Sequence, residues 1–189
     1  MGFSVSWLAV KGKDSESVLV ELELLKTSQY KDFPESDIVG AILPNDWYLI
    51  ALNDCCSEYV EEDVLRQLSE HCELIATVVE EHVMYSMAQY WKNGSRVWQI
   101  THDAQQSTLD LVHTGELPDS YESIKSECMR EQEEDSDDEY PVDYIFEIPL
   151  LVAQEYVGYK HDEDFFDEEG KFTILKSTKE PTQAWWKFW

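Results

Sequence analysis

The sequence predicts an α+β fold, and three observations support this class. Segments with the apolar pattern of strands alternate with segments whose apolar residues recur every three or four positions, as in helices. Hydrophobic residues make up 43% of the 189 residues, which is enough to build a buried core. An Asn-Gly pair at Asn93 and Gly94 separates two long apolar runs and marks a β-hairpin.

The first predicted element is a strand over residues 3–11, because apolar side chains fall on both of its faces, as in the middle of a sheet. Asp14 follows and offers an N-cap for a helix. One face of that helix carries an apolar stripe made of Val18, Leu19, Leu22 and Leu25. The polar segment after the helix contains Pro34 and predicts a loop.

A hairpin and a second helix come next. Apolar runs at residues 38–43 and 47–52 flank a Pro-Asn-Asp turn, which predicts two paired strands. Ser57 can cap a helix whose apolar stripe is Val60, Val64, Leu65 and Leu68. Residues 72–79 are apolar and rich in β-branched side chains, hence a strand. The resulting order, βαββαβ, is that of a ferredoxin-like core.

A β-hairpin extends this core, with residues 83–92 and 95–102 on either side of the Asn-Gly turn. Placing Lys92 opposite Ser95 sets the register. One face of the hairpin then carries Tyr85, Met87, Trp91, Trp98, Ile100 and His102. Residues 1–115 are therefore expected to form the α+β sheet core.

Residues 116–189 are more acidic, with 21 acidic and 7 basic side chains against 19 and 7 in residues 1–115. A helix beginning near Pro118 would place Tyr121, Ile124 and Cys128 on one side. A second helix would begin at Pro149 and end at Gly158 as its C-cap, followed by a short strand over residues 172–175. We expect this acidic C-terminal helical region to pack on the core within the same domain.

The charge of the chain limits its partners. Forty acidic residues against 14 basic ones give a net charge of −26, which argues against direct binding of nucleic acid or of an anionic membrane. The sequence has no apolar run of about 18 residues, and its first residues lack a secretory-signal pattern. Four cysteines do not make a disulfide framework. These features predict a cytoplasmic protein with reduced thiols.

Two segments are candidates for binding a partner. Residues 131–139 are expected to form a solvated acidic loop that docks a basic protein, through Glu131, Glu133, Glu134, Asp135, Asp137, Asp138 and Glu139. The last residues are aromatic and could anchor an interface, a homodimer included, or fold back over the sheet; they contain Trp185, Trp186 and Trp189. The leading prediction is a non-enzymatic acidic binding protein without a cofactor. A third hypothesis is that the carboxylates mimic the charge of nucleic acid and bind a DNA-binding protein.

The alternative is a small hydrolase or a metal-dependent enzyme. Acidic or thiol neighbours flank several histidines, including His161 beside Asp162. The candidate acid–base or metal-binding group is Glu81, His82, His102 and Asp103. The sequence lacks HExxH, CxxC and GxSxG patterns and a P-loop, so the enzyme reading is the weaker of the two.

Several segments of the chain resemble segments of bacterial single-domain proteins of unassigned function: residues 80–86, 96–106 and 142–163, together with the opening residues 6–13. With these four segments the resemblance covers most of the chain. The resemblance implies a bacterial source and a stand-alone protein, and it brings no catalytic residues with it. Small acidic bacterial proteins of this kind include immunity proteins that neutralise toxin domains. By analogy, an immunity or inhibitor role is expected here.

Overall fold

The computed structural model describes residues 2–135, 142–163 and 171–179. Within these ranges the chain forms a mixed α+β protein with one large sheet and four α-helices, as the sequence predicts. The elements in chain order are β1 (Ser4–Lys11), α1 (Ser15–Glu21), β2 (Leu24–Lys31), β3 (Ile38–Ile42), the 3₁₀ turn η1 (Pro44–Asp46), β4 (Trp47–Leu52), the 3₁₀ turn η2 (Glu58–Val60), α2 (Glu62–Leu68), β5 (Glu73–Glu80), β6 (Tyr85–Lys92), β7 (Ser95–Asp103), β8 (Val112–Gly115), α3 (Tyr121–Glu134), α4 (Glu147–Val157) and β9 (Phe172–Ser177).

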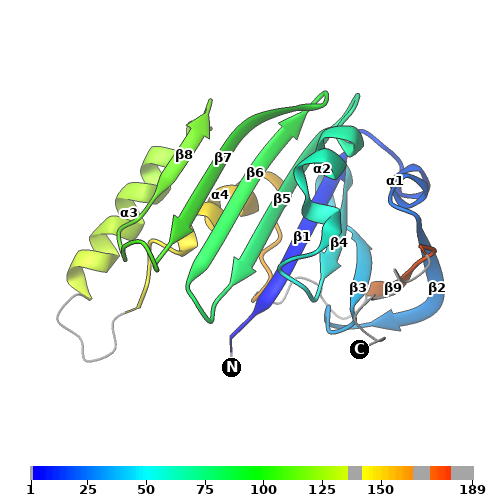
Figure 1. Ribbon diagram of the computed structural model, residues 1–189, viewed down its shortest axis with the longest axis horizontal. Coiled ribbons are helices and arrows are strands. Elements are labelled where there is room, and N and C mark those ends of the chain that lie inside the picture. Colours follow the sequence, from blue (N-terminus) through cyan, green and yellow to red (C-terminus); the bar gives the residue numbers. More distant parts are fainter. Residues whose placement is uncertain (1, 136–141, 164–170, 180–189) are drawn as a thin grey trace, which may run out of the picture.

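Nine strands form a single sheet in the order β2-β9-β3-β4-β1-β5-β6-β7-β8, and every neighbouring pair is antiparallel. Helices cover both faces (Figure 1). On one face α1 and α2 pack over a core that includes Leu8 and Leu74. On the other face α3 and α4 pack over a core that includes Trp7 and Ile75. Nine strands exceed a simple ferredoxin-like sheet. Two of them, β2 and β8, are absent from the prediction made from the sequence.

The first helix is capped as predicted, because the Asp14 carboxylate accepts a hydrogen bond from the backbone N–H of Ser17. The helix ends earlier than expected, at Glu21. Leu25 therefore does not belong to its apolar stripe and lies in β2, where it is 61% exposed. The predicted loop after α1 is wrong. Strand β2 escapes the apolar pattern because it is a polar edge strand, exposed along most of its length.

The hairpin of β3 and β4 has the predicted strands, joined by η1. The next helix differs from the prediction. Ser57 caps the short turn η2 through a hydrogen bond from the N–H of Tyr59, and α2 begins only at Glu62. Leu65 and Leu68 still bury the expected stripe. Strand β5 follows within one residue of its predicted bounds.

The hairpin of β6 and β7 keeps the predicted turn, with Lys92 opposite Ser95, but its register changes beyond the first pairs. A bulge lies where Trp91 pairs with Arg96 while Tyr90 pairs with Trp98, so Val97 is the extra residue. The predicted single face is therefore wrong. Trp98, Ile100 and His102 share the α4 face with Tyr90, whereas Trp91 lies in the core of the opposite face.

The last third of the chain packs α3 and α4 onto the sheet and adds β9 to it. Helix α3 buries Tyr121 and Cys128, as expected, and α4 ends at Gly158, whose φ of 73° is the left-handed conformation that glycine adopts readily. The expected acidic loop is corrected in part, because Glu131–Glu134 belong to helix α3. Asp137, Asp138 and Glu139 lie outside the described residues, as do Trp185, Trp186 and Trp189.

Candidate functional site

Helix α3 carries the candidate partner-binding residues that the structure describes. Its buried residues, Tyr121 and Cys128, are seven positions apart and place one side of the helix against the core. The opposite side is exposed and mostly acidic, with Glu122, Glu127, Glu133 and Glu134. The helix lies at the β8 end of the sheet (Figure 1). It therefore presents these carboxylates to solvent there.

One cation organises the carboxylates on α3. Arg130 lies in ion pairs with Glu127, with Glu134 at 2.7 Å and with Glu131 at 3.8 Å. The hydrogen bonds to Glu134 and Glu127 raise the pKa of the Arg130 guanidinium further above its ordinary value. The pairs with Glu127 and Glu134 are three and four residues apart, the spacing of neighbours on a helix surface, so they stabilise the helix while its net charge stays negative.

The C-terminal end of α3 is tied to the segment that leads into α4. The Asp135 carboxylate accepts a hydrogen bond from the N–H of Val142 at 2.7 Å. The Gln132 side chain accepts one from the N–H of Tyr144 at 2.9 Å and donates one to the carbonyl of Val142 at 3.0 Å. Three polar contacts therefore hold the acidic end of the helix in place, rather than leaving it to move freely.

Most of the cationic side chains are engaged within the molecule. Eight lysines and arginines of the described residues form ion pairs with carboxylates: Lys13, Lys26, Arg66, Lys92, Arg96, Arg130, Lys160 and Lys179. With only 14 basic residues against 40 acidic ones, the surface keeps a large excess of carboxylates after these pairs are made. A cationic surface can reduce that repulsion by binding there.

His102, a candidate metal ligand from the sequence, is fully buried. Its Nδ1 lies 2.6 Å from the carbonyl oxygen of Asp110, and its Nε2 lies 3.0 Å from Oδ2 of Asp143. Burial lowers the pKa of His102, but the hydrogen bonds to Asp143 and Asp110 outweigh burial and raise it above the ordinary value. A protonated ring donates through both nitrogens, which suits two acceptors.

Within the part of the chain that the structure describes, no group of close ligand atoms joins His102 to the other three members of the predicted metal group. His82 is exposed and its Nδ1 lies 2.6 Å from Glu80. Asp103 caps the turn after β7 through the N–H of Gln105. Among the described residues, the one group of metal-binding side chains with mutually close ligand atoms is Asp54, Cys55 and Cys56. The structure therefore does not bring the predicted metal group together.

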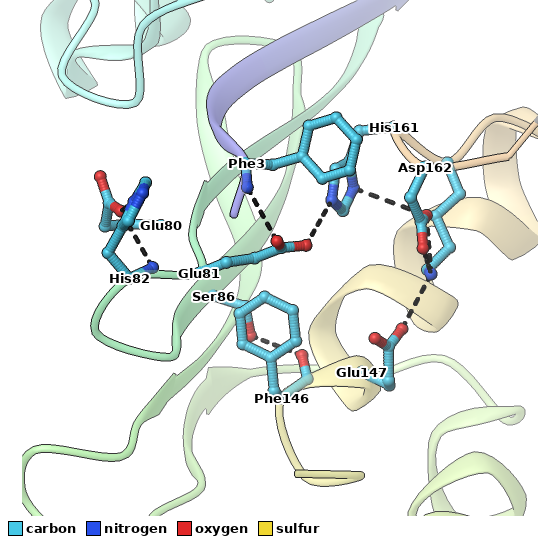
Figure 2. A network of polar contacts seen from close by, with 10 residues as sticks. Phe3, Glu80, Glu81, His82, Ser86, Phe146, Glu147, His161 and Asp162 are labelled. Atoms are coloured by element: carbon cyan, nitrogen blue, oxygen red, sulfur yellow. Dashed lines mark hydrogen bonds and ion pairs between the residues drawn. The ribbon is translucent and has the colours of Figure 1, made fainter. Parts of the chain in front are cut away.

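Glu81, the fourth candidate, belongs to a polar network at the end of the sheet, which Figure 2 shows. Its Oε2 accepts a hydrogen bond from the N–H of Phe3 at 2.7 Å, and its Oε1 lies 3.6 Å from Nε2 of His161. The His161 ring stands edge-on to that of Phe3 and is nearly buried. Burial lowers the pKa of His161 and keeps the ring neutral at neutral pH.

A buried lysine completes this network. Lys160 Nζ lies 2.8 Å from both carboxylate oxygens of Asp162 and 3.0 Å from Oε2 of Glu147, at the start of α4. Burial lowers the pKa of Lys160, and its hydrogen bonds to the two carboxylates outweigh that effect and raise it. The network joins the residue before β1, the β5–β6 turn, the start of α4 and the segment that follows α4. The sequence showed the His161–Asp162 pair but gave no sign of Glu81 or Glu147 beside it.

Two thiols and a carboxylate meet on the α1–α2 face at the same end of the sheet. Cys55 Sγ lies 3.6 Å from Cys56 Sγ and donates a hydrogen bond to Oε2 of Glu80 at 3.3 Å. The pKa of Cys55 is raised to about 11, mainly by burial. This thiol is therefore protonated at neutral pH. A protonated thiol is a poor nucleophile. Hydrogen bonds from Ser4 and His82 lower the pKa of Glu80 to about 2.

Comparison with protein-family models, with curated proteins and with solved structures finds no match to this chain. The resemblance to bacterial single-domain proteins therefore stays a prediction. Over the residues that the structure describes, no helix combines the length and the apolar character needed to cross a membrane.

Proposed function

We propose that this chain is a non-enzymatic binding protein whose acidic surface on α3 docks a basic protein partner. The observation that carries the proposal is the distribution of charge. Intramolecular pairs already engage eight of the described cationic side chains, while the outer side of α3 exposes carboxylates in excess of Arg130. Opposite charge steers association and favours a basic surface over a neutral one.

The support for α3 as the docking element is that it is both acidic and held in place. Its apolar side is anchored in the core, and three hydrogen bonds tie its end to residues 142–144. A preorganised surface loses less conformational entropy on binding than a flexible one. The rigid acidic helix is thus better suited to a specific partner than a disordered acidic loop of equal charge.

The finer parts of the proposal rest on the sequence. The partner we infer is a toxin domain, with this chain as its immunity or inhibitor protein in the bacterial cytoplasm; the large negative charge and the resemblance to bacterial proteins support this role. We also infer a ferredoxin-like arrangement within the sheet. Its support is the antiparallel order β3-β4-β1-β5 with α1 and α2 on the same face.

Binding measurements with charge variants test the proposal. The partners are purified basic proteins, beginning with those encoded by the genes that adjoin this one. The test variant is Glu131→Gln/Glu133→Gln/Glu134→Gln. Exposed charge pairs contribute about 0.2 to 1 kcal/mol each, so the loss of three carboxylates should weaken the affinity roughly tenfold.

A matched control removes the same charge from another place. Asp32→Asn/Glu35→Gln/Asp37→Asn changes three exposed acidic residues between β2 and β3, at the opposite end of the sheet from α3. We expect this variant to bind within about twofold of the original chain. Equal weakening by both variants would show that net charge alone matters and that α3 is not the docking surface. A panel without any binding partner would contradict the proposal as a whole.

A further inference from the structure

The strongest unassigned feature lies at the edge of the sheet where β4 and β5 end, and it is independent of the proposed docking surface. Asp54, Cys55 and Cys56 form the turn after β4, and the ligand atoms of these three side chains lie within 4.8 Å of one another. Glu80, the last residue of β5, reaches the same place, with Oε2 3.3 Å from Cys55 Sγ. We call these four residues the thiol site.

Two of the separations between these atoms fit a tetrahedral metal centre. Zinc binds thiolate sulfur at about 2.3 Å, so two thiolates on one tetrahedral zinc ion stand about 3.8 Å apart. The sulfur atoms of Cys55 and Cys56 are 3.6 Å apart. A thiolate and a carboxylate oxygen on the same ion stand about 3.5 Å apart. The distance from Cys55 Sγ to Glu80 Oε2 is 3.3 Å. Both separations need only small shifts to receive the ion.

The ligands are also held in position by the surrounding fold. Oδ1 of Asp54 accepts the N–H of Cys56 at 2.9 Å, and the backbone carbonyl of Asp54 accepts the hydroxyl of Ser6 on β1 at 2.7 Å. Glu80 is oriented by Ser4 on one oxygen and by Nδ1 of His82 on the other, at 2.5 and 2.6 Å. Outer groups of this kind orient metal ligands and raise metal affinity.

Access and chemistry both suit a borderline-soft divalent cation. Cys56 and Asp54 are exposed, so an ion can enter from solvent, while Cys55 is half-buried. Thiolate sulfur selects zinc over magnesium or calcium, which prefer sites made of oxygen alone. We propose that these two thiols and two carboxylates bind one zinc ion. Binding forms two zinc–sulfur bonds and releases the two thiol protons to solvent, with no oxidation or reduction.

Titration of the full chain with zinc tests this proposal, with cadmium as a spectroscopic probe and a reductant that does not bind metals. We expect one zinc ion per chain, measured against a competing chelator, and a rise in melting temperature on zinc addition. Cadmium should give a thiolate charge-transfer absorption of the strength of two sulfur ligands. The Cys55→Ser and Cys56→Ser variants should each lose zinc affinity by about 100-fold or more, and Glu80→Gln by about tenfold.

Cys72→Ser is the matched control, because Cys72 is a buried thiol away from the site and serine can keep its hydrogen bond to the carbonyl of Leu68. We expect this variant to bind zinc as the original chain does. Circular dichroism establishes that each variant is folded. The proposal is overturned if the folded chain binds no zinc, if the Cys55→Ser/Cys56→Ser double variant still binds it, or if Cys72→Ser weakens binding as strongly as the site variants.

Discussion

The buried pair of His102 and Asp143 allows a prediction of stability and of its pH dependence. In Asp143→Asn the side chain keeps its shape, and its amide oxygen can still accept the N–H of Phe146 that Oδ1 accepts now. The substitution removes the negative charge that lies 3.0 Å from Nε2 of His102. We therefore expect His102 to lose its raised pKa and to become neutral in the folded variant.

The expected magnitude follows from the contact distance. Two unit charges 3.0 Å apart attract by about 5 to 6 kcal/mol at an effective dielectric constant of 20. Burying both groups offsets much of this attraction, because His102 is fully buried and the Asp143 side chain is 14% exposed. A hydrogen bond to a charged group contributes about 1.5 to 3 kcal/mol net. Asp143→Asn should then cost about 2 kcal/mol while His102 is protonated.

The pH dependence follows from the direction of the pKa shift. The pKa of His102 is raised in the folded state, so its contribution is fully present below the unfolded value near 6.5 and is lost as pH rises through the folded pKa. The difference in unfolding free energy between the original chain and Asp143→Asn should be about 2 kcal/mol near pH 6. Near pH 8.5 it should fall below about 1 kcal/mol.

Urea unfolding of both proteins at the two pH values measures this difference. Asp110→Asn is the control, because it keeps the backbone carbonyl that His102 contacts and removes only a charge that raises the pKa of His102 less than the Asp143 charge does. The control should lose less than about 0.5 kcal/mol. A difference that stays constant between the two pH values, or grows at high pH, would refute the assignment of His102 as a cation in the folded protein.

Three further predictions concern the fold. Gly158→Ala should cost about 1 to 2 kcal/mol by urea unfolding, because Gly158 has a φ of 73°, which disfavours a residue with a Cβ. No atom of the described residues lies within 4 Å of the new Cβ, so a clash adds nothing to this cost, and no loss would contradict a backbone cause. Lys160→Met should cost about 2 to 4 kcal/mol of unfolding free energy by the same method, since it leaves Glu147 and Asp162 without their shared cation. A variant as stable as the original chain would show that this network contributes nothing to stability. Tyr121→Phe should leave the melting temperature unchanged or slightly higher, because the buried Tyr121 hydroxyl has no hydrogen-bond partner among the described residues. A clear drop would mean that a bound water satisfies this hydroxyl.

The predictable parts of the fold are those with local signals. Asp14 caps α1, Gly158 ends α4, and the Asn-Gly turn joins β6 to β7, because each needs a residue type that suits one backbone conformation. The missed features lack such signals. Strand β2 buries little, so its sequence resembles a loop. The bulge at Val97 adds one residue to a strand without any residue type that demands it.

The candidate sites show the same limit. The sequence predicts His102 as a candidate metal-binding or acid–base residue, but Asp143 lies 41 residues away and no sequence pattern joins the two. The adjacent thiols of Cys55 and Cys56 were visible, whereas Glu80 reaches them only because β1 pairs with both β4 and β5. Long-range antiparallel pairing brings these groups together, and a single sequence does not reveal that pairing.

The most direct test of the proposed function is the association rate constant of the chain with a basic partner, measured by stopped flow as ionic strength rises from about 0.02 to about 0.5 M. We predict a fall of at least tenfold for the original chain, and a markedly weaker salt dependence for Glu131→Gln/Glu133→Gln/Glu134→Gln. An association rate that does not change with salt, or a triple variant with the original salt dependence, would contradict docking through the acidic surface of α3.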